Sequence, residues 1–130
     1  MDPVKEYMVK KVKDIDAGAS ALDAAKKLAT LGIGSLMVRE KGEYIGMVSE
    51  TEIVRQLVAK KRDSKTISVT DIMNTDIDYI EQVETMSKAI AIMREKKLRY
   101  LVVRNGGTVV GILSVKDLLA FYEKWFTLTL

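Results

Sequence analysis

Two stretches of the chain carry apolar residues at the spacing of one helix face. The first follows Ser20 and the second follows Thr85, and in both the apolar side chains recur at positions i, i+3, i+4 and i+7. Serine and threonine are favoured helix N-caps, and Gly32 suits the left-handed residue that ends many helices. The pattern predicts two helices, with buried faces formed by Ala21, Ala24, Ala25 and Leu28 and by Met86, Ala89, Ile90 and Met93.

Each predicted helix is followed by two short apolar runs with a turn between them. The turn is Lys41-Gly42 in the first half and Asn105-Gly106-Gly107 in the second, and asparagine followed by glycine is a strong hairpin signal. The runs are typical of strands and cover Ser35–Arg39, Tyr44–Val48, Tyr100–Arg104 and Val109–Leu113.

A last helix is predicted to begin at Ser49 and again at Ser114. Short strands at Lys13–Ile15 and Asp78–Ile80 would precede the first helix of each half. The order is therefore β-α-β-β-α, twice. The last helices are expected to bury Ile53, Val54 and Leu57 in the first half and Leu118, Leu119 and Tyr122 in the second.

The two halves are copies of one unit. Residues 4–62 align with residues 69–127 without a gap, and the identities fall at turns and at periodic apolar positions. We therefore divide the chain into repeat 1 (1–62), a linker (63–68) and repeat 2 (69–130). The ten identical pairs are Val4/Val69, Met8/Met73, Ile15/Ile80, Ala24/Ala89, Leu36/Leu101, Val38/Val103, Arg39/Arg104, Gly42/Gly107, Gly46/Gly111 and Ser49/Ser114.

The strands are apolar on almost every position, which indicates that both faces of each sheet are covered. Helices would cover one face, and the other repeat is the simplest cover for the second. The expected fold class is α+β, with two βαββα repeats packed sheet to sheet about a pseudo-twofold axis.

Composition removes several kinds of chemistry. The chain has 130 residues, of which 48% are apolar and 30% charged, as in soluble globular proteins. It has no cysteine and no histidine, which excludes disulfides, Cys/His zinc sites and Ser-His-Asp triads. No apolar run approaches the ~20 residues of a membrane span, and no secretory signal opens the chain, so we expect a cytoplasmic protein. The net charge of +3 is too small to indicate nucleic-acid binding.

The element that links the last strand to the last helix could carry function. It reads Gly46-Met47-Val48-Ser49-Glu50-Thr51-Glu52 in the first copy and Gly111-Ile112-Leu113-Ser114-Val115-Lys116-Asp117 in the second. Serine followed three residues later by an acid is a capping box, which is a purely structural interpretation. A helix N-terminus is also a natural phosphate site, and an acid beside it can accept both hydroxyls of a ribose.

In this context the chain resembles the cystathionine-β-synthase (CBS) domain family, whose units end in Gly-h-h-Ser/Thr-x-x-Asp-h-h, where h is apolar. The resemblance covers both copies and includes the opening Thr70-Asp71-Ile72-Met73, more loosely Lys5-Glu6-Tyr7-Met8, and the strand Leu98–Val103. It implies two clefts between paired repeats that bind adenosine-containing ligands.

The resemblance also assigns roles to residues. Ser114 would contact phosphate, Asp117 the ribose hydroxyls and Arg99 phosphate, while Lys116 could meet a phosphate or remain solvated. The remaining candidates are the strand starts Gly34-Ser35 and Arg99-Tyr100, the matching pair Ser49 and Glu52, and the linker residues Thr66 and Ile67, which would frame the adenine.

The first copy departs from the family pattern. Glu52 replaces the usual aspartate, and Gly34 stands where the second copy has Arg99. The family's strand proline is also absent, replaced by Met37 and Val102. We therefore expect the site with Ser114 and Asp117 to be the better of the two.

The sequence predicts a non-enzymatic sensor that binds AMP, ADP, ATP or a similar ligand, with S-adenosylmethionine less favoured. The chain holds no effector domain, so its output would pass to a partner protein or through a homodimer. The alternative is an interaction or dimerisation module whose ligand sites are vestigial. No cofactor, metal, membrane or nucleic-acid partner is expected.

Overall fold

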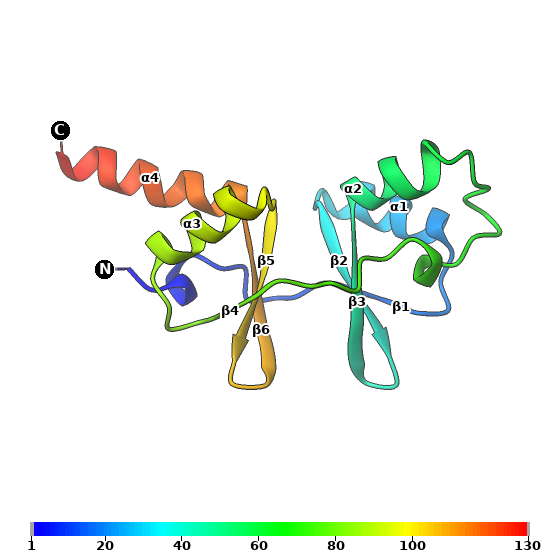
Figure 1. Ribbon diagram of the computed structural model, residues 1–130, viewed down its shortest axis with the longest axis horizontal. Helices are drawn as coiled ribbons and strands as arrows, with labels where there is room; N and C mark the ends of the chain where they lie inside the picture. Colours follow the sequence, from blue (N-terminus) through cyan, green and yellow to red (C-terminus); the bar gives the residue numbers. More distant parts are fainter. Residues whose placement is uncertain (1, 130) are drawn as a thin grey trace. The chain divides into compact units, whose positions relative to one another are not determined.

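The computed structural model describes residues 2–129, without the side chains of residues 128 and 129, and shows two compact units. Lys13–Ile77 form the first unit, and Met1–Val12 together with Asp78–Leu130 form the second. Each unit contains a three-stranded sheet with helices against one face (Figure 1). The predicted α+β class with two βαββα repeats is confirmed.

In the first unit the central strand pairs with both others. β1 runs parallel to β2, and β2 runs antiparallel to β3 with Ser35 opposite Ser49. The core between sheet and helices includes Leu36, Val38 and Val48. The elements are β1 (Asp14–Asp16), α1 (Ala21–Leu31), β2 (Ser35–Glu40), β3 (Glu43–Ser49), α2 (Glu50–Glu52), the π-helix η2 (Ile53–Val58) and the 3-10 helix η3 (Val69–Asp71).

The second unit repeats this topology. β4 runs parallel to β5, and β5 runs antiparallel to β6 with Tyr100 opposite Ser114. No helix among the described residues combines the length and apolar character needed to cross a bilayer. The elements are the 3-10 helix η1 (Val4–Glu6), β4 (Tyr79–Glu81), α3 (Met86–Lys96), β5 (Tyr100–Asn105), β6 (Thr108–Ser114) and α4 (Val115–Thr129).

The first helix of each repeat begins as predicted, and the one in repeat 1 also ends as predicted. Ser20 accepts a hydrogen bond from the Asp23 amide, and Gly32 closes α1 with a left-handed backbone at φ 63°. Thr85 caps α3 through the Lys88 amide, and Lys97 takes the left-handed position that glycine fills in the first copy, at φ 56°.

The last helices differ from the prediction. Val54, Leu119 and Tyr122 were expected to be buried but are 59%, 65% and 50% exposed, so those predictions are wrong. Leu57 is buried as predicted, and Phe121 is buried in place of Leu119 and Tyr122. Leu57 lies eight residues after its cap Ser49, whereas Phe121 lies seven after Ser114. The first copy thus has one extra residue, which its π-helix absorbs, and an alignment without a gap could not show this.

The segment that opens each sequence repeat packs in the unit formed by the other repeat. Val9 exchanges backbone hydrogen bonds with Ile112 of β6, at 2.9 and 3.0 Å. Asn74 does the same with Met47 of β3, at 2.8 and 2.9 Å. The compact units are therefore offset from the sequence repeats, because residues 1–12 complete the second unit and residues 63–77 the first.

A small polar network ties the N-terminal segment to α4. The Asp2 carboxylate accepts hydrogen bonds from the Tyr7 hydroxyl at 2.7 Å and from Lys124 Nζ at 3.1 Å. The Tyr7 hydrogen bond, followed by Lys124, lowers the pKa of Asp2 below its ordinary value. The Tyr7 ring also packs edge-on against Phe121, with ring centroids 5.4 Å apart.

Tyr7→Phe is expected to raise the pKa of Asp2, because it removes the largest cause of the lowering and keeps the ring. A lowered carboxyl pKa stabilises the fold above the unfolded-state pKa, and this contribution is lost as pH falls through the folded-state pKa. The stability deficit of Tyr7→Phe should therefore be present near neutral pH and shrink in acid. NMR titration of Asp2 and melting curves against pH measure both effects. Tyr122→Phe, which alters an exposed phenol on α4, should change neither.

Candidate functional site

At the end of β6, Asp117 is held by the residue that precedes α4. The Ser114 amide donates to Asp117 Oδ2 at 2.7 Å, and Ser114 Oγ donates to the same oxygen at 3.1 Å. Among the described residues, Asp117 Oδ1 has no hydrogen-bond partner. The half-buried carboxylate therefore caps the strand-to-helix junction with one of its two oxygens.

The start of β5 lies beside this junction. Tyr100 pairs with Ser114 in the sheet, and the Val115 amide donates to the Arg99 carbonyl at 3.1 Å. The structure thus brings Arg99, Tyr100, Ser114, Lys116 and Asp117 together at one end of the second unit. The Arg99 and Lys116 side chains are exposed, so two cations and one half-buried acid share this end. We call these five residues the second-unit site.

The first unit has the same geometry with different charge. Ser49 donates to Glu52 Oε1 from its amide at 2.8 Å and from Oγ at 2.6 Å, so the longer glutamate still folds back onto its cap. The Glu50 amide donates to the Gly34 carbonyl at 3.1 Å, and Ser35 pairs with Ser49. Gly34, Ser35, Ser49 and Glu52 are therefore together. Glu50 and Glu52 make this end acidic, because Gly34 supplies no cation.

Thr66 and Ile67 are not brought to the set in their own unit, which is the first. The Ile67 carbonyl accepts a hydrogen bond from the Ala21 amide at 2.8 Å, at the start of α1. α1 follows the C-terminal end of β1, where Asp16 pairs with Arg39, whereas Ser49 lies at the opposite end of β2 beside Ser35. The linker residues expected to frame an adenine thus lie toward the far end of the first sheet.

The sequence pattern did not predict that the segments with Met8 and Met73 run beside β6 and β3. A Cβ added to Gly111 would lie 2.6 Å from Met8 Sδ, and one added to Gly46 would lie 2.6 Å from Met73 Sδ. Both glycines therefore let a neighbouring segment cross the strand closely. A signal was present, because Met8/Met73 and Gly46/Gly111 are two of the identical pairs.

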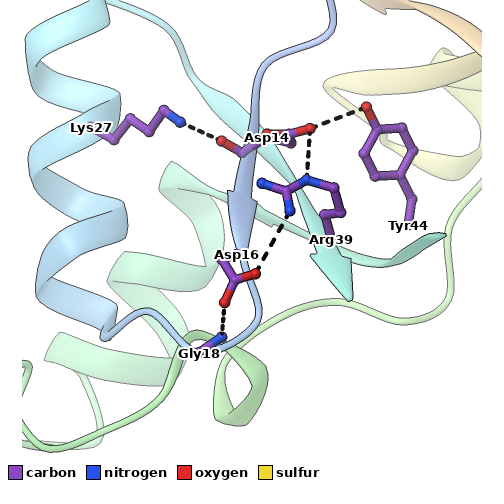
Figure 2. Close-up of polar contacts among 6 residues, drawn as sticks. All are labelled: Asp14, Asp16, Gly18, Lys27, Arg39 and Tyr44. Atoms are coloured by element: carbon purple, nitrogen blue, oxygen red, sulfur yellow. Dashed lines mark hydrogen bonds and ion pairs between the residues drawn. The ribbon is translucent and has the colours of Figure 1, made fainter. Parts of the chain in front are cut away.

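Arg39 and Arg104 occupy structural positions away from the two motifs. Figure 2 shows Arg39 between two acids of β1, with Nε 3.3 Å from Asp14 Oδ2 and Nη1 3.7 Å from Asp16 Oδ1. The Tyr44 hydroxyl donates to Asp14 Oδ2 at 3.4 Å, and burial, with Asp14 nearby, raises the pKa of Tyr44. Arg104 likewise lies 3.6 Å from Glu81 and 4.0 Å from the centroid of the Tyr79 ring. Both arginines are therefore paired with acids of the neighbouring strand of their own sheet.

No cluster of three or more acidic side chains in the described part of the chain is arranged to hold a metal ion. The second-unit site presents backbone groups, a hydroxyl, a single carboxylate and two cations. This set of groups suits a phosphorylated organic ligand with hydroxyl groups.

Comparison with known proteins identifies one family throughout. The CBS domain model matches residues 4–59 and again residues 69–124. An uncharacterised protein of Methanopyrus kandleri is 30% identical over 112 residues, which cover 82% of this chain and 57% of that protein, so the chain spans little over half of its length.

Two solved structures share the fold over most of both chains. An uncharacterised conserved protein from Pyrococcus horikoshii has a TM-score of 0.88 at 25% identity, over 94% of this chain and 95% of that one. A protein with CBS domains from Burkholderia ambifaria, provisionally described as acting in signal transduction, has a TM-score of 0.83 at 30% identity, over 87% and 83%.

Proposed function

Because the chain belongs to the CBS domain family, we propose that it is a non-enzymatic regulatory module that binds an adenosine-containing ligand such as AMP, ADP or ATP. S-adenosylmethionine is the less favoured ligand. The bound state is communicated to a partner protein or to a second copy of the chain. A ligand shifts such an equilibrium only through different affinities for two states, so the partner must distinguish the bound form from the free form.

The second-unit site supports this proposal best, and the observation that carries it is the Asp117 carboxylate. One oxygen is fixed by Ser114 at 2.7 and 3.1 Å, and the other, which has no hydrogen-bond partner among the described residues, would accept from the pair of hydroxyls that a ribose offers. Arg99 and Lys116 supply positive charge for phosphate within the same unit. The first unit, with Gly34 and Glu52, lacks that charge and is the weaker candidate.

Isothermal titration of the full chain with AMP, ADP, ATP and S-adenosylmethionine tests the proposal. At least one adenosine compound should bind more tightly than millimolar. Chromatography of ATP incubated with the protein should show no product, as expected of a binding module. Affinities weaker than millimolar for all four compounds would contradict the proposal.

A second candidate function, self-association, is favoured by the outer face of α4. Val115, Leu119 and Tyr122 are exposed and follow one another at spacings of four and three residues, which is the spacing of a helix-pairing stripe. Lys116 and Glu123 follow the first and last of these residues. In an antiparallel pair of α4 helices, the lysine of one copy would face the glutamate of the other. The stripe is therefore complementary to itself, and we propose a second copy of the chain as its partner.

Leu119→Glu is expected to convert a dimer into a monomer, because it places a charge at the centre of this stripe. Size-exclusion chromatography with light scattering measures the mass in solution. Val83→Glu is the matched control, since it puts the same charge on a residue that is 68% exposed outside α4. A monomeric wild-type chain, or a Leu119→Glu variant that stays dimeric, would contradict self-association through α4.

A further inference from the structure

The excess of positive over negative charge lies in one unit of the protein. The second unit has 11 Lys and Arg against 8 Asp and Glu, whereas the first has 10 of each. The net charge of +3 therefore belongs to the second unit. Much of its positive charge lies where α3 ends and β5 begins, in the run Arg94-Glu95-Lys96-Lys97-Leu98-Arg99.

Four cations of the second unit, three from this run and one from α4, belong to the second-unit site or lie within five residues of it in the sequence. Lys97 precedes Arg99 by two residues, so their Cα atoms are at most about 7.6 Å apart. The Arg99 carbonyl bonds the Val115 amide, which places Lys116 beside the same strand start. Lys96 is excluded because it pairs with Asp78 at 2.7 Å. The basic cluster, as we call it, consists of the exposed residues Arg94, Lys97, Arg99 and Lys116.

The first repeat has no counterpart of this cluster. In the alignment of the two copies, each of the four cations is aligned with a neutral residue of the first repeat. A charge that only stabilised the shared fold would be expected in both copies, since the helices and strands are the same. The four neutral residues are Ala29, Gly32, Gly34 and Thr51.

The backbone conformation of Lys97 allows its charge to be removed by a substitution that should not destabilise the fold. Its φ of 56° is the left-handed region, which Gly32 fills in the first copy at φ 63° and which costs a side-chain residue more than glycine. Lys41 and Lys61 also have positive φ, so the backbone by itself marks no site. What sets Lys97 apart is its position among three other cations.

We propose that the basic cluster binds the polyphosphate tail of a nucleoside triphosphate, and so makes the second-unit site selective for a triphosphate over a monophosphate. This inference rests on the proposed function. A monophosphate needs little more than the N-terminal end of α4 and the Arg99 side chain. Two further phosphates add negative charge that extends beyond Arg99, toward Lys97 and Arg94 at the end of α3.

The test compares adenosine, AMP and ATP by isothermal titration of the full chain, without divalent cations, at low and moderate salt. Wild-type protein should bind ATP about tenfold more tightly than AMP, roughly the effect of one to two solvent-exposed ion pairs. Salt should narrow this difference, because exposed charges are screened.

Lys97→Gly should weaken ATP binding about fivefold, leave AMP binding unchanged and raise the melting temperature. Lys97→Gln should weaken ATP binding equally without the gain in stability, because it removes the charge and retains the backbone cost. Lys61→Gly is the matched control, since it relieves the same backbone geometry in the turn after η2 and should alter neither affinity.

Equal affinities for AMP and ATP, or an unchanged ratio in both Lys97 variants, would overturn the triphosphate inference while AMP binding still supported the regulatory module. If adenosine, AMP and ATP all fail to bind, the proposed function fails, and the inference fails with it.

Discussion

Asp117→Ala is expected to weaken binding of the adenosine-containing ligand by about a hundredfold at the second-unit site. Each hydrogen bond to a charged group contributes about 1.5–3 kcal/mol, and the alanine variant loses two bonds to the ribose. It also loses the hydrogen bonds that Ser114 donates to Oδ2, so the free energy of unfolding should fall by about 1 kcal/mol, as for a lost helix cap. Titration calorimetry and urea unfolding measure the two effects separately.

Glu52→Ala provides the control for capping. Glu52 holds Ser49 through the same two kinds of hydrogen bond, at 2.8 and 2.6 Å, so its removal should destabilise the fold to a similar degree. Affinity at the second-unit site should nevertheless be retained. If both variants lose stability alike and neither changes affinity, Asp117 is a cap alone and has no role in binding.

Gly111→Ala is expected to destabilise the protein by about 1–3 kcal/mol, the usual effect of forcing extra volume into a packed region. The added Cβ would lie 2.6 Å from Met8 Sδ and 2.9 Å from the Val9 carbonyl oxygen. The methionine side chain can move, but the carbonyl belongs to a backbone bonded twice to Ile112. The N-terminal segment must therefore shift as a whole. Urea unfolding gives the free energy of the variant.

Gly107→Ala is the matched control, because nothing lies within 4 Å of its added Cβ and its φ is not positive. It should change stability by no more than about 0.5 kcal/mol. A Gly111→Ala variant as stable as Gly107→Ala would show that the N-terminal segment is not packed against β6 as described.

Local features of the fold could be predicted because they depend on neighbouring residues. Ser20 and Thr85 mark helix starts and Gly32 a helix end, since capping chemistry acts over three or four residues. The π-helix escaped prediction because a single inserted residue changes no composition or motif. It only removes Val54 from the buried side of the helix, whereas Leu57 stays buried as predicted, and this becomes visible once the core is known.

The two sets of site residues were predictable for the same reason. Ser114 and Asp117 are three residues apart, and Arg99 is joined to them by the pairing of adjacent strands. The positions of Thr66 and Ile67 depend on the path of the linker. That path is fixed by long-range contacts such as the hydrogen bond from the Ala21 amide to the Ile67 carbonyl. The roles assigned to all these residues remain predictions until ligands are titrated.

The opening segment of each repeat packs in the unit formed by the other repeat, and this exchange bears on how such a chain could have arisen. A polypeptide made of residues 69–130 alone would lack Met8 and Val9, so the edge of β6 would have no segment paired with it. Two identical half-length chains could repair this defect by exchanging their N-terminal segments. Gene duplication with fusion would then join such an obligate pair into a single polypeptide. In that polypeptide each repeat still packs its opening segment in the unit formed by the other repeat.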